Sequence, residues 1–531
     1  MAGMSKDSDR QVIPQWRAFE VTRDRGELSP LLAAKSSNFQ TESLDALQED
    51  WKSRPTISIA ADLVSTAFVL GREADALQAA QFLADNTLAP SAARSIAEIC
   101  LRSVEIAGEK PPESRPRIND SEPDPQFEHG FSRQFHAQIR QTRKRLVQYQ
   151  RNAVLWANLA RLFTSVGSQH KAIQAMRVAR SLAPHNRFVL RSASRLMLHL
   201  GEGKDAHRIL KESPILQFDP WILSAEIATA AAIGKRSQYV KLGRRIIESS
   251  RFQPFCLSEL ASALGTLEAI AGNRRVSRRL IEQSLLRPTE NAVAQAAFLI
   301  RNHDVTTSEG PDFSLSAEAC TWHAFRGAKW DLAIRQVKKW IQDQPFSSRP
   351  AAQGSHMAST IFEDFRLAEE YAKIGLLSNP DDISLINNLA FALAKQDRVE
   401  EAIRALNRLD PRRIPPEHAI FIMATAGLIE FRSGRIESGR LLYRRSIELA
   451  HRMQHDAEKV ARIYFAIEEL RVKSPQSELV RKEAIDGAES LSQPWQAVLL
   501  RRLERYKPPE TPDTFQTPRI PLSDRFGLSS I

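Results

Sequence analysis

Residues 153–186 read AVLWANLARLFTSVGSQHKAIQAMRVARSLAPHN, and this stretch decides the fold. When it is moved along the chain by 34 residues, Gly167 falls on Gly201 and Ala172 falls on Ala206. A fixed period of this length is typical of stacked helical repeats, in which each unit buries its apolar face against the next one. The sequence therefore predicts an all-α protein.

The side chains inside this stretch predict two packed helices. Trp156, Leu159 and Phe163 form one apolar stripe at helical spacing. Small residues such as Ala160 and Ala172 allow the two helices to approach closely, and the larger side chains fill the groove beside them. A single hairpin of this kind leaves apolar surface exposed, so we expect the next hairpin to stack on it.

The pattern resembles the tetratricopeptide repeat, a helix–turn–helix unit of 34 residues. Residues 153–186 match it at nearly every signature position, the match around 383–411 is also strong, and weaker copies extend to about residue 446. The resemblance implies a right-handed superhelical solenoid whose first helices line a concave groove. It also implies a non-catalytic scaffold or adaptor that binds a protein partner, an acidic or extended segment, as the regulatory or sensor subunit of a complex.

The composition divides the chain into five parts. Prolines mark a linker and a tail, while the long middle part alternates between helical patterns and short turns. Residues 303–314 interrupt the repeat spacing, which indicates an insertion or a damaged repeat. The expected parts are an N-terminal, partly disordered arm at 1–54, helical hairpins or degenerate repeats at 55–108, a proline-rich linker at 109–127, the repeat array at 128–505 and a proline-rich tail at 506–531.

Several first-helix side chains are candidates for partner binding. The resemblance places three arginines on the concave surface, and arginine forks bind carboxylates and phosphates in a bidentate manner. Asparagine side chains at similar positions could hydrogen-bond the backbone of a bound segment. The alternative is that these side chains form a solvated helix surface. The candidates are Asn158, Arg161, Arg191, Arg195, Asn387 and Asn388.

The charge distribution leaves a second function open. The formal net charge is +11, and residues 151–290 hold 22 Lys and Arg against 10 Asp and Glu. A basic surface of this kind attracts acidic partners, including nucleic acid. The alternative function is therefore nucleic-acid binding through the basic 130–290 region. The expected first-helix surface offers few aromatic side chains for base stacking, which favours a protein partner.

No catalytic, cofactor or metal motif stands out. The chain has no GxxxxGK[ST] loop, and its three cysteines lack metal-ligand spacing. His451 and His455 are four residues apart, as zinc ligands can be, but no third ligand is evident. We expect no cofactor and no membrane contact, and the polar N-terminus and the sparse cysteines favour a cytoplasmic location.

Both ends of the chain contain possible anchors. Ile13, Trp16 and Phe19 suit an extended arm that docks on the solenoid, although a loose tail is equally compatible with the sequence. The C-terminal tail is either inert or an extended peptide laid on a partner. Its possible anchors are Phe515, Ile520, Leu522, Phe526 and Leu528.

Overall fold

The computed structural model describes residues 12–19, 38–70, 72–89, 93–94, 97–98, 100–101, 131–249, 252–308, 310–488, 493–508 and 522. Every regular element in these ranges is a helix, which confirms the all-α prediction. The chain divides into two compact units. The described residues from 12 to 316 form the amino-terminal unit, and the described residues from 317 onward form the carboxy-terminal unit.

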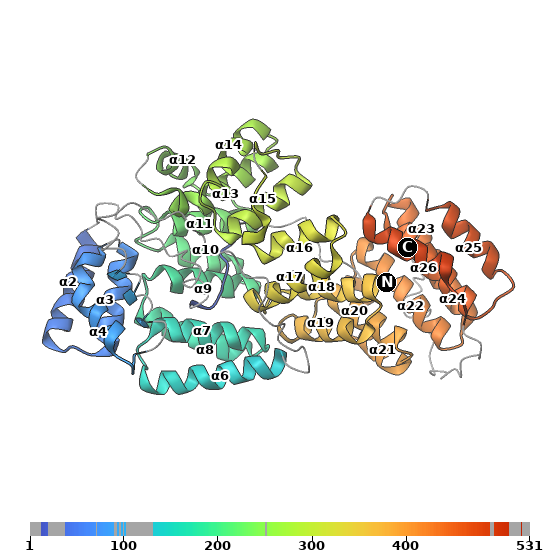
Figure 1. The fold of residues 1–531 in the computed structure, drawn as a ribbon, viewed down its shortest axis with the longest axis horizontal. Helices are drawn as coiled ribbons and strands as arrows, with labels where there is room; N and C mark the ends of the chain where they lie inside the picture. The colour runs from blue at the N-terminus through green and yellow to red at the C-terminus, as the bar shows by residue number, and fades with distance from the viewer. Residues whose placement is uncertain are drawn as a thin grey trace. The chain divides into compact units, whose positions relative to one another are not determined.

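The amino-terminal unit consists of helices that follow one another as antiparallel pairs (Figure 1). First helices α7, α9, α11, α13 and α15 contact one another in that order, and second helices α8, α10, α12 and α14 alternate with them. The bounds are α2 (Asn38–Ser53), α3 (Ile57–Leu70), η1 (Glu73–Ala76), α4 (Leu77–Asp85), α6 (Phe131–Gln148), α7 (Ala153–Ser165), α8 (Gln169–Leu182), α9 (Arg187–His199), α10 (Gly203–Lys211), α11 (Pro220–Ala232), α12 (Val240–Glu248), α13 (Pro254–Ile270), α14 (Arg274–Ser284), α15 (Glu290–Asn302) and η2 (Phe313–Leu315).

The 34-residue period appears directly in the helix ends. The side chain of Asn152 caps α7 by accepting the N–H of Leu155 at 3.1 Å, and Asn186, 34 residues later, caps α9 in the same way. Gly167 and Gly201 each take a positive φ, 73° and 80°, in the turn after a first helix. Glycine adopts this left-handed conformation without steric cost. The spacing therefore repeats a helix start and a helix stop.

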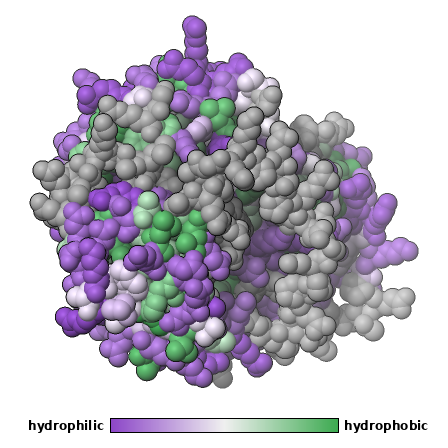
Figure 2. All heavy atoms as spheres, turned by 60° about the vertical axis from the view of Figure 1, so that its left-hand side comes forward, coloured by the Kyte–Doolittle hydropathy of each residue, from purple (hydrophilic) through white to green (hydrophobic). Residues whose placement is uncertain are grey.

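Helices α2, α3 and α4 share one hydrophobic core with the beginning of the array. Leu44, Leu63 and Leu83 are buried in it, and Val154 of α7 joins the same cluster. Figure 2 shows the side on which these helices come forward: hydrophilic side chains cover most of the visible coloured surface, and hydrophobic ones gather in small groups. Burial of the apolar faces thus fixes α2–α4 to the repeats that follow.

The carboxy-terminal unit continues the alternation of paired helices. Pairs α16–α17, α18–α19, α20–α21, α22–α23 and α24–α25 pack internally, and α26 packs on α24. The bounds are α16 (Ala317–Arg326), α17 (Trp330–Asp343), α18 (Ser348–Met357), η3 (Ala358–Phe362, a π-helix), α19 (Phe365–Ser378), α20 (Ile383–Lys395), α21 (Val399–Leu406), η4 (Pro411–Arg413), α22 (Pro416–Arg432), α23 (Ile436–Arg452), α24 (Ala457–Arg471), α25 (Ser477–Asp486) and α26 (Pro494–Arg505).

Two glycines let α22 and α23 approach each other closely. A Cβ atom on Gly427 would lie 2.8 Å from Tyr443 Cδ2, and one on Gly439 would lie 2.6 Å from Phe431 Cδ2. Both distances are too short for carbon atoms in van der Waals contact. The aromatic rings of Phe431 and Tyr443 occupy the space that these missing side chains leave, with their centroids 6.0 Å apart.

Buried charges in the carboxy-terminal unit are paired. Arg432 binds Glu468 with both Nε and Nη2, at 2.8 Å and 3.0 Å, and Lys395 Nζ lies 3.6 Å from the same carboxylate. Burial lowers the pKa of Lys395 to about 8. Burial alone would raise the pKa of Glu468, but Arg432 and Lys395 outweigh it and hold this pKa below its usual value.

The divisions expected from composition remain predictions, and the structure adds detail to them. Helix α2 lies inside 1–54 and packs on α3, so helical structure begins within the part expected to be an arm. The expected linker at 109–127 lies outside the described residues. The two units divide at residue 316, directly after the segment 303–314 that interrupts the repeat spacing.

Candidate functional site

The inner surface of the amino-terminal unit holds an extended segment of the chain itself, residues 12–19. In Figure 1 it is the short blue segment beside α9. Val12, Trp16, Arg17 and Phe19 are buried, and the indole of Trp16 is 0% exposed. Of the two possibilities left open for the arm, docking on the helices is the one that this segment shows.

Asparagine side chains hold the backbone of the segment at both ends. Asn291 Nδ2 on α15 donates a hydrogen bond to the carbonyl oxygen of Ile13 at 3.0 Å. The N–H of Phe19 donates to Asn158 Oδ1 on α7 at 3.3 Å. Because α7 and α15 are the first and last of the five first helices, the segment crosses the whole row. Contacts of this kind recognise an extended backbone and leave specificity to the side chains.

The side chains of the segment meet both charge and aromatic surface. Arg17 forms an ion pair with Glu290, in which both groups are buried. Phe19 packs edge-on against Phe188 of α9, with ring centroids 5.3 Å apart. A buried charged group needs a close partner of opposite charge, because an uncompensated charge in the interior is costly. The surface therefore accepts an arginine flanked by aromatic side chains.

Arginines on the same surface are neutralised by carboxylates. Arg191 Nη2 lies 2.7 Å from Glu259 Oε2, and its Nη1 donates to the carbonyl oxygen of Trp221 at 3.2 Å. Arg187 pairs with Asp219 at 2.8 Å in the same way. Arg187 and Arg191 are therefore already occupied and are not free to bind the carboxylates of a partner.

A small cavity of about 110 Å³ remains between the segment and the helices. Three segment side chains, Gln15, Arg17 and Phe19, form one wall. The helices supply the opposite wall from α9, α11, α13, α15 and the cap residue before α15. That wall consists of Arg187, Phe188, Arg191, Ser192, Trp221, Phe255, Glu259, Thr289 and Glu290.

The predicted site residues lie in two separate groups. Asn158, Arg161, Arg191 and Arg195 belong to α7 and α9, and only the first three are buried. Of the four, Asn158 makes a hydrogen bond to the segment. We expected Arg191 to face a partner, but it is 9% exposed and paired with Glu259. Its charge is thereby satisfied inside the chain.

Asn387 and Asn388 lie on α20 of the carboxy-terminal unit. They are 2% and 0% exposed. Asn388 Nδ2 donates to the carbonyl oxygen of Ala352 on α18 at 3.4 Å, which joins two neighbouring first helices. Both side chains are therefore buried, although we expected them on a surface that a partner can reach. Their role in partner binding remains a prediction.

The structure brings in residues that sequence reasoning did not select. Glu259, Glu290 and Asn291 carry the polar contacts of the site, and each is buried. A carboxylate or amide on the apolar face of a first helix implies a buried partner, because these groups are costly to bury without one, but the sequence does not say which residue that partner is. The anchors Trp16 and Phe19 were the stronger signal.

One residue of the C-terminal tail is also docked. Leu522 is buried, and its N–H donates to Glu430 Oε1 at 2.6 Å. Glu430 is also bound by Arg435, whose Nη2 lies 2.7 Å from the same carboxylate oxygen. The four other expected anchors, Phe515, Ile520, Phe526 and Leu528, lie outside the described residues.

The other candidates for chemistry have structural partners. His451 Nδ1 lies 3.0 Å from Glu458, while His455 Nδ1 accepts the N–H of Ala457. No three His, Cys, Asp or Glu side chains are grouped to hold a metal ion within the described residues. All three cysteines are buried, and burial raises the pKa of Cys100. Across the described ranges, no helix has both the length and the apolar character needed to cross a membrane.

Comparisons with known proteins return only remote structural likeness. No protein-family model and no curated relative matches the chain. Yeast Tom70 is 13% identical over 70% of this chain and 92% of its own, with a TM-score of 0.28. The APC/C hetero-tetramer Cut9-Hcn1 is 13% identical over 88% and 93%, with a TM-score of 0.38. The human IFIT1 dimer with PPP-AAAA is 13% identical over 88% and 100%, with a TM-score of 0.27.

These scores are too low to carry an argument about function. The fold rests instead on the paired helices, the recurring caps and the glycine turns of the chain itself. On that ground, the chain is an all-α helical-repeat protein that resembles the tetratricopeptide repeat proteins.

Proposed function

We propose that this protein is a helical-repeat scaffold that binds an extended segment of a protein partner on the inner surface of its amino-terminal unit. The observation that supports the proposal is the way in which residues 12–19 are held there. Asn158 and Asn291 bind the backbone, Glu290 binds Arg17, and Phe188 packs on Phe19. A partner segment with the same chemistry would take the place of the chain's own segment.

The charges favour a basic partner segment over the acidic one expected from the arginines. Glu290 is 2% exposed and faces Arg17, whereas Arg187 and Arg191 are already bound to Asp219 and Glu259. An additional carboxylate would be repelled by Glu290 and would find both arginines occupied. An arginine between aromatic side chains would satisfy the same groups that now hold the segment.

Peptides added in trans test this proposal. The acceptors are the full chain carrying Arg17→Ala, which weakens its own segment, and the chain carrying Arg17→Ala together with Glu290→Arg. The probes are a fluorescent peptide with the sequence of residues 10–22 and the same peptide with Arg17→Glu. We expect the first acceptor to bind the natural peptide at least about tenfold more tightly than the charge-reversed one. The second acceptor should show the reverse preference, because complementary charges fix partner choice.

Circular dichroism and thermal melting establish that both acceptors are folded. If each acceptor binds the two peptides equally, or if neither peptide binds a folded acceptor, the inner surface is not a binding site for such segments. Fluorescence anisotropy gives the peptide affinity at low and high salt. An affinity that depends on the buried ion pair should change little with salt, whereas general electrostatic attraction should weaken, because salt screens exposed charges more strongly than a buried pair.

A further inference from the structure

The outer helices of the amino-terminal unit carry arginines for which no ion-pair partner lies among the described residues. Helices α8, α10, α12 and α14 hold 13 Lys and Arg but only three acidic residues. Arg177 and Arg180 on α8 are exposed and form no ion pair with any described residue. Their charge is therefore available to a ligand.

Several arginines of the carboxy-terminal unit serve as an internal comparison, because they are paired with carboxylates of the same unit. Arg398 lies 2.6 Å from Glu369, and Arg440 lies 2.7 Å from Glu469. An arginine of this chain thus does not need to remain unpaired, and the absence of an ion pair for Arg177 and Arg180 among the described residues is a local property.

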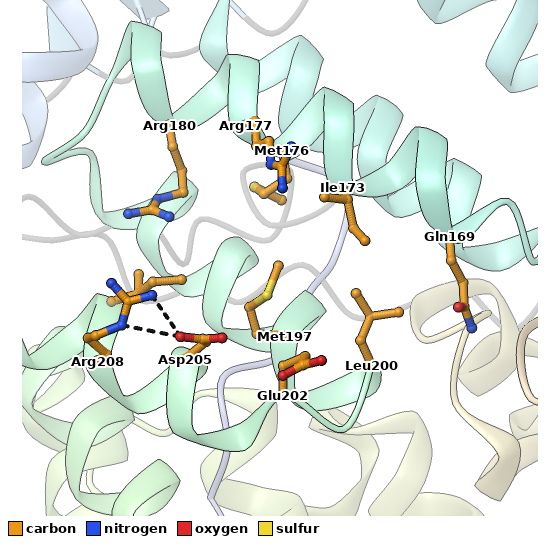
Figure 3. A pocket seen from close by; sticks show the side chains of 11 residues that line it. Gln169, Ile173, Met176, Arg177, Arg180, Met197, Leu200, Glu202, Asp205 and Arg208 are labelled. Atoms are coloured by element: carbon orange, nitrogen blue, oxygen red, sulfur yellow. Dashed lines mark hydrogen bonds and ion pairs between the residues drawn. The ribbon is translucent and has the colours of Figure 1, made fainter.

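A cleft of about 380 Å³ lies beside these arginines, between α8 and α10 (Figure 3). Its volume falls within the range of ligand pockets, roughly 300–1,000 Å³. Apolar side chains from α8, α9, α10 and the cap residue of α9 form its floor, namely Ile173, Met176, Met197, Leu200 and Ile209. Two methionines in this floor allow it to adapt to different apolar side chains.

The polar groups of the cleft are distributed unevenly. In Figure 3, Arg180 lies on one side across from Arg208, whereas Gln169 lies at the opposite side. Arg208 Nη2 binds Asp205 Oδ1 at 2.7 Å, so these two charges compensate each other. Arg177 and Arg180 line the cleft without such compensation, and Glu202 is the remaining acidic residue on its rim.

The geometry points to a binding site for an acidic amphipathic helix of a protein partner in the cleft between α8 and α10. An apolar side chain of the partner would occupy the floor, and carboxylates one turn away would bind Arg177 and Arg180. A helix places such residues on one face at spacings of three and four. The groove between two neighbouring helices is also the surface on which a third helix packs.

The floor argues against the two other polyanionic partners. No aromatic side chain lines the cleft, so it offers no stacking platform for the bases of a single-stranded nucleic acid. An anionic membrane would require apolar side chains that project from a helix face into the lipid. Here Met176 and Ile209 are 1% and 6% exposed and lie recessed between helices.

This site is independent of the inner surface and is tested separately on the full chain. A displayed library of 16-residue helical peptides is selected on the natural protein and then depleted on the variant R177E/R180E. The matched control is R275E/R279E, which makes the same change in net charge on exposed positions of α14. A third variant, Ile173→Gln, alters the apolar floor without changing the charge.

We expect the surviving peptides to combine leucine or methionine with acidic residues three or four positions away. Their affinity for R177E/R180E should be at least about tenfold weaker than for the natural protein, and their affinity for Ile173→Gln about threefold weaker. Their affinity for the α14 control should be unchanged. If no peptide survives depletion, or if both charge variants weaken binding equally, the proposal is overturned. Full competition by a single-stranded RNA oligonucleotide or by anionic vesicles would assign the arginines to a general polyanion surface instead.

Discussion

Arg432 and Glu468 form a two-point ion pair in which both side chains are almost fully buried, 5% and 1% exposed. The pair joins the end of α22 to α24 and recruits Lys395 from α20, so three first helices of the carboxy-terminal unit meet at one carboxylate. Because both charges are buried, removal of either one leaves the other without its main compensation.

Replacing Arg432 with methionine is therefore expected to lower the free energy of local unfolding by about 3–5 kcal/mol, because Glu468 remains buried with a weaker partner. Hydrogen exchange of residues 457–471 measures this effect. Arg413→Met, at a side chain that is 88% exposed, is the matched control. The triple variant that also carries Glu468→Met and Lys395→Met removes all three charges of the group and should recover much of the loss. A triple variant as unstable as the single one would show that packing, and not charge, is responsible.

Asp62 on α3 should make the amino-terminal unit less stable as the pH rises. Burial raises the pKa of Asp62 to about 7, against the opposing effect of Arg151. The folded state therefore keeps a proton that the unfolded chain has released, and stability falls between the unfolded pKa, about 4, and the folded value. Asp62→Asn should raise the melting temperature more at about pH 8 than at about pH 5.

The exposed Asp50→Asn variant provides the comparison for this pH effect. It removes a carboxylate close to α3 in sequence without removing a buried one. An equal gain at both pH values for Asp62→Asn would contradict the assignment of the pH dependence to this residue.

The contact between α22 and α23 should not tolerate added side chains. Gly427→Ala would place a methyl group 2.8 Å from the ring of Tyr443 and 3.2 Å from the carbonyl oxygen of Gly439. Overpacking of this kind costs about 1–3 kcal/mol. Urea unfolding followed by circular dichroism measures the change. Gly310→Ala, where a Cβ atom would meet nothing within 4 Å, should have little effect.

The docked segment should depend on Trp16. Its side chain is fully buried, and Trp16→Ala removes the largest buried apolar side chain of the segment. We expect trypsin to cleave after Arg17 at least about tenfold faster in this variant, because the segment opens more often. Val147→Ala, at a side chain that is 74% exposed, is the control. An unchanged cleavage rate would mean that the segment is held without the tryptophan.

The repeat could be predicted from the sequence because its signals are local. Asn152 and Asn186 each cap the helix that starts at the next residue by accepting an N–H three residues ahead, and Gly167 and Gly201 permit the turns. Each of these signals acts within one hairpin and recurs at a fixed spacing. The fold class therefore follows from short stretches of chain.

The inner site could be predicted only in part, because its contacts connect distant parts of the sequence. Phe19 meets Asn158 across 139 residues, and no periodicity links the two. Arg191 looked available to a partner, but Glu259, 68 residues later, binds it. Which charges are matched depends on how the helices stack, and this information is absent from any single repeat.

The hydrogen bond between Ile13 and Asn291 spans 278 residues. On a ribosome that adds about 5–20 residues per second, Ile13 would wait on the order of 15–60 s before α15, which supplies the donor Asn291, is made. During that interval Trp16 and Phe19 are exposed to the cell without their final cover. Newly made chains should therefore engage chaperones through this stretch until α15 emerges.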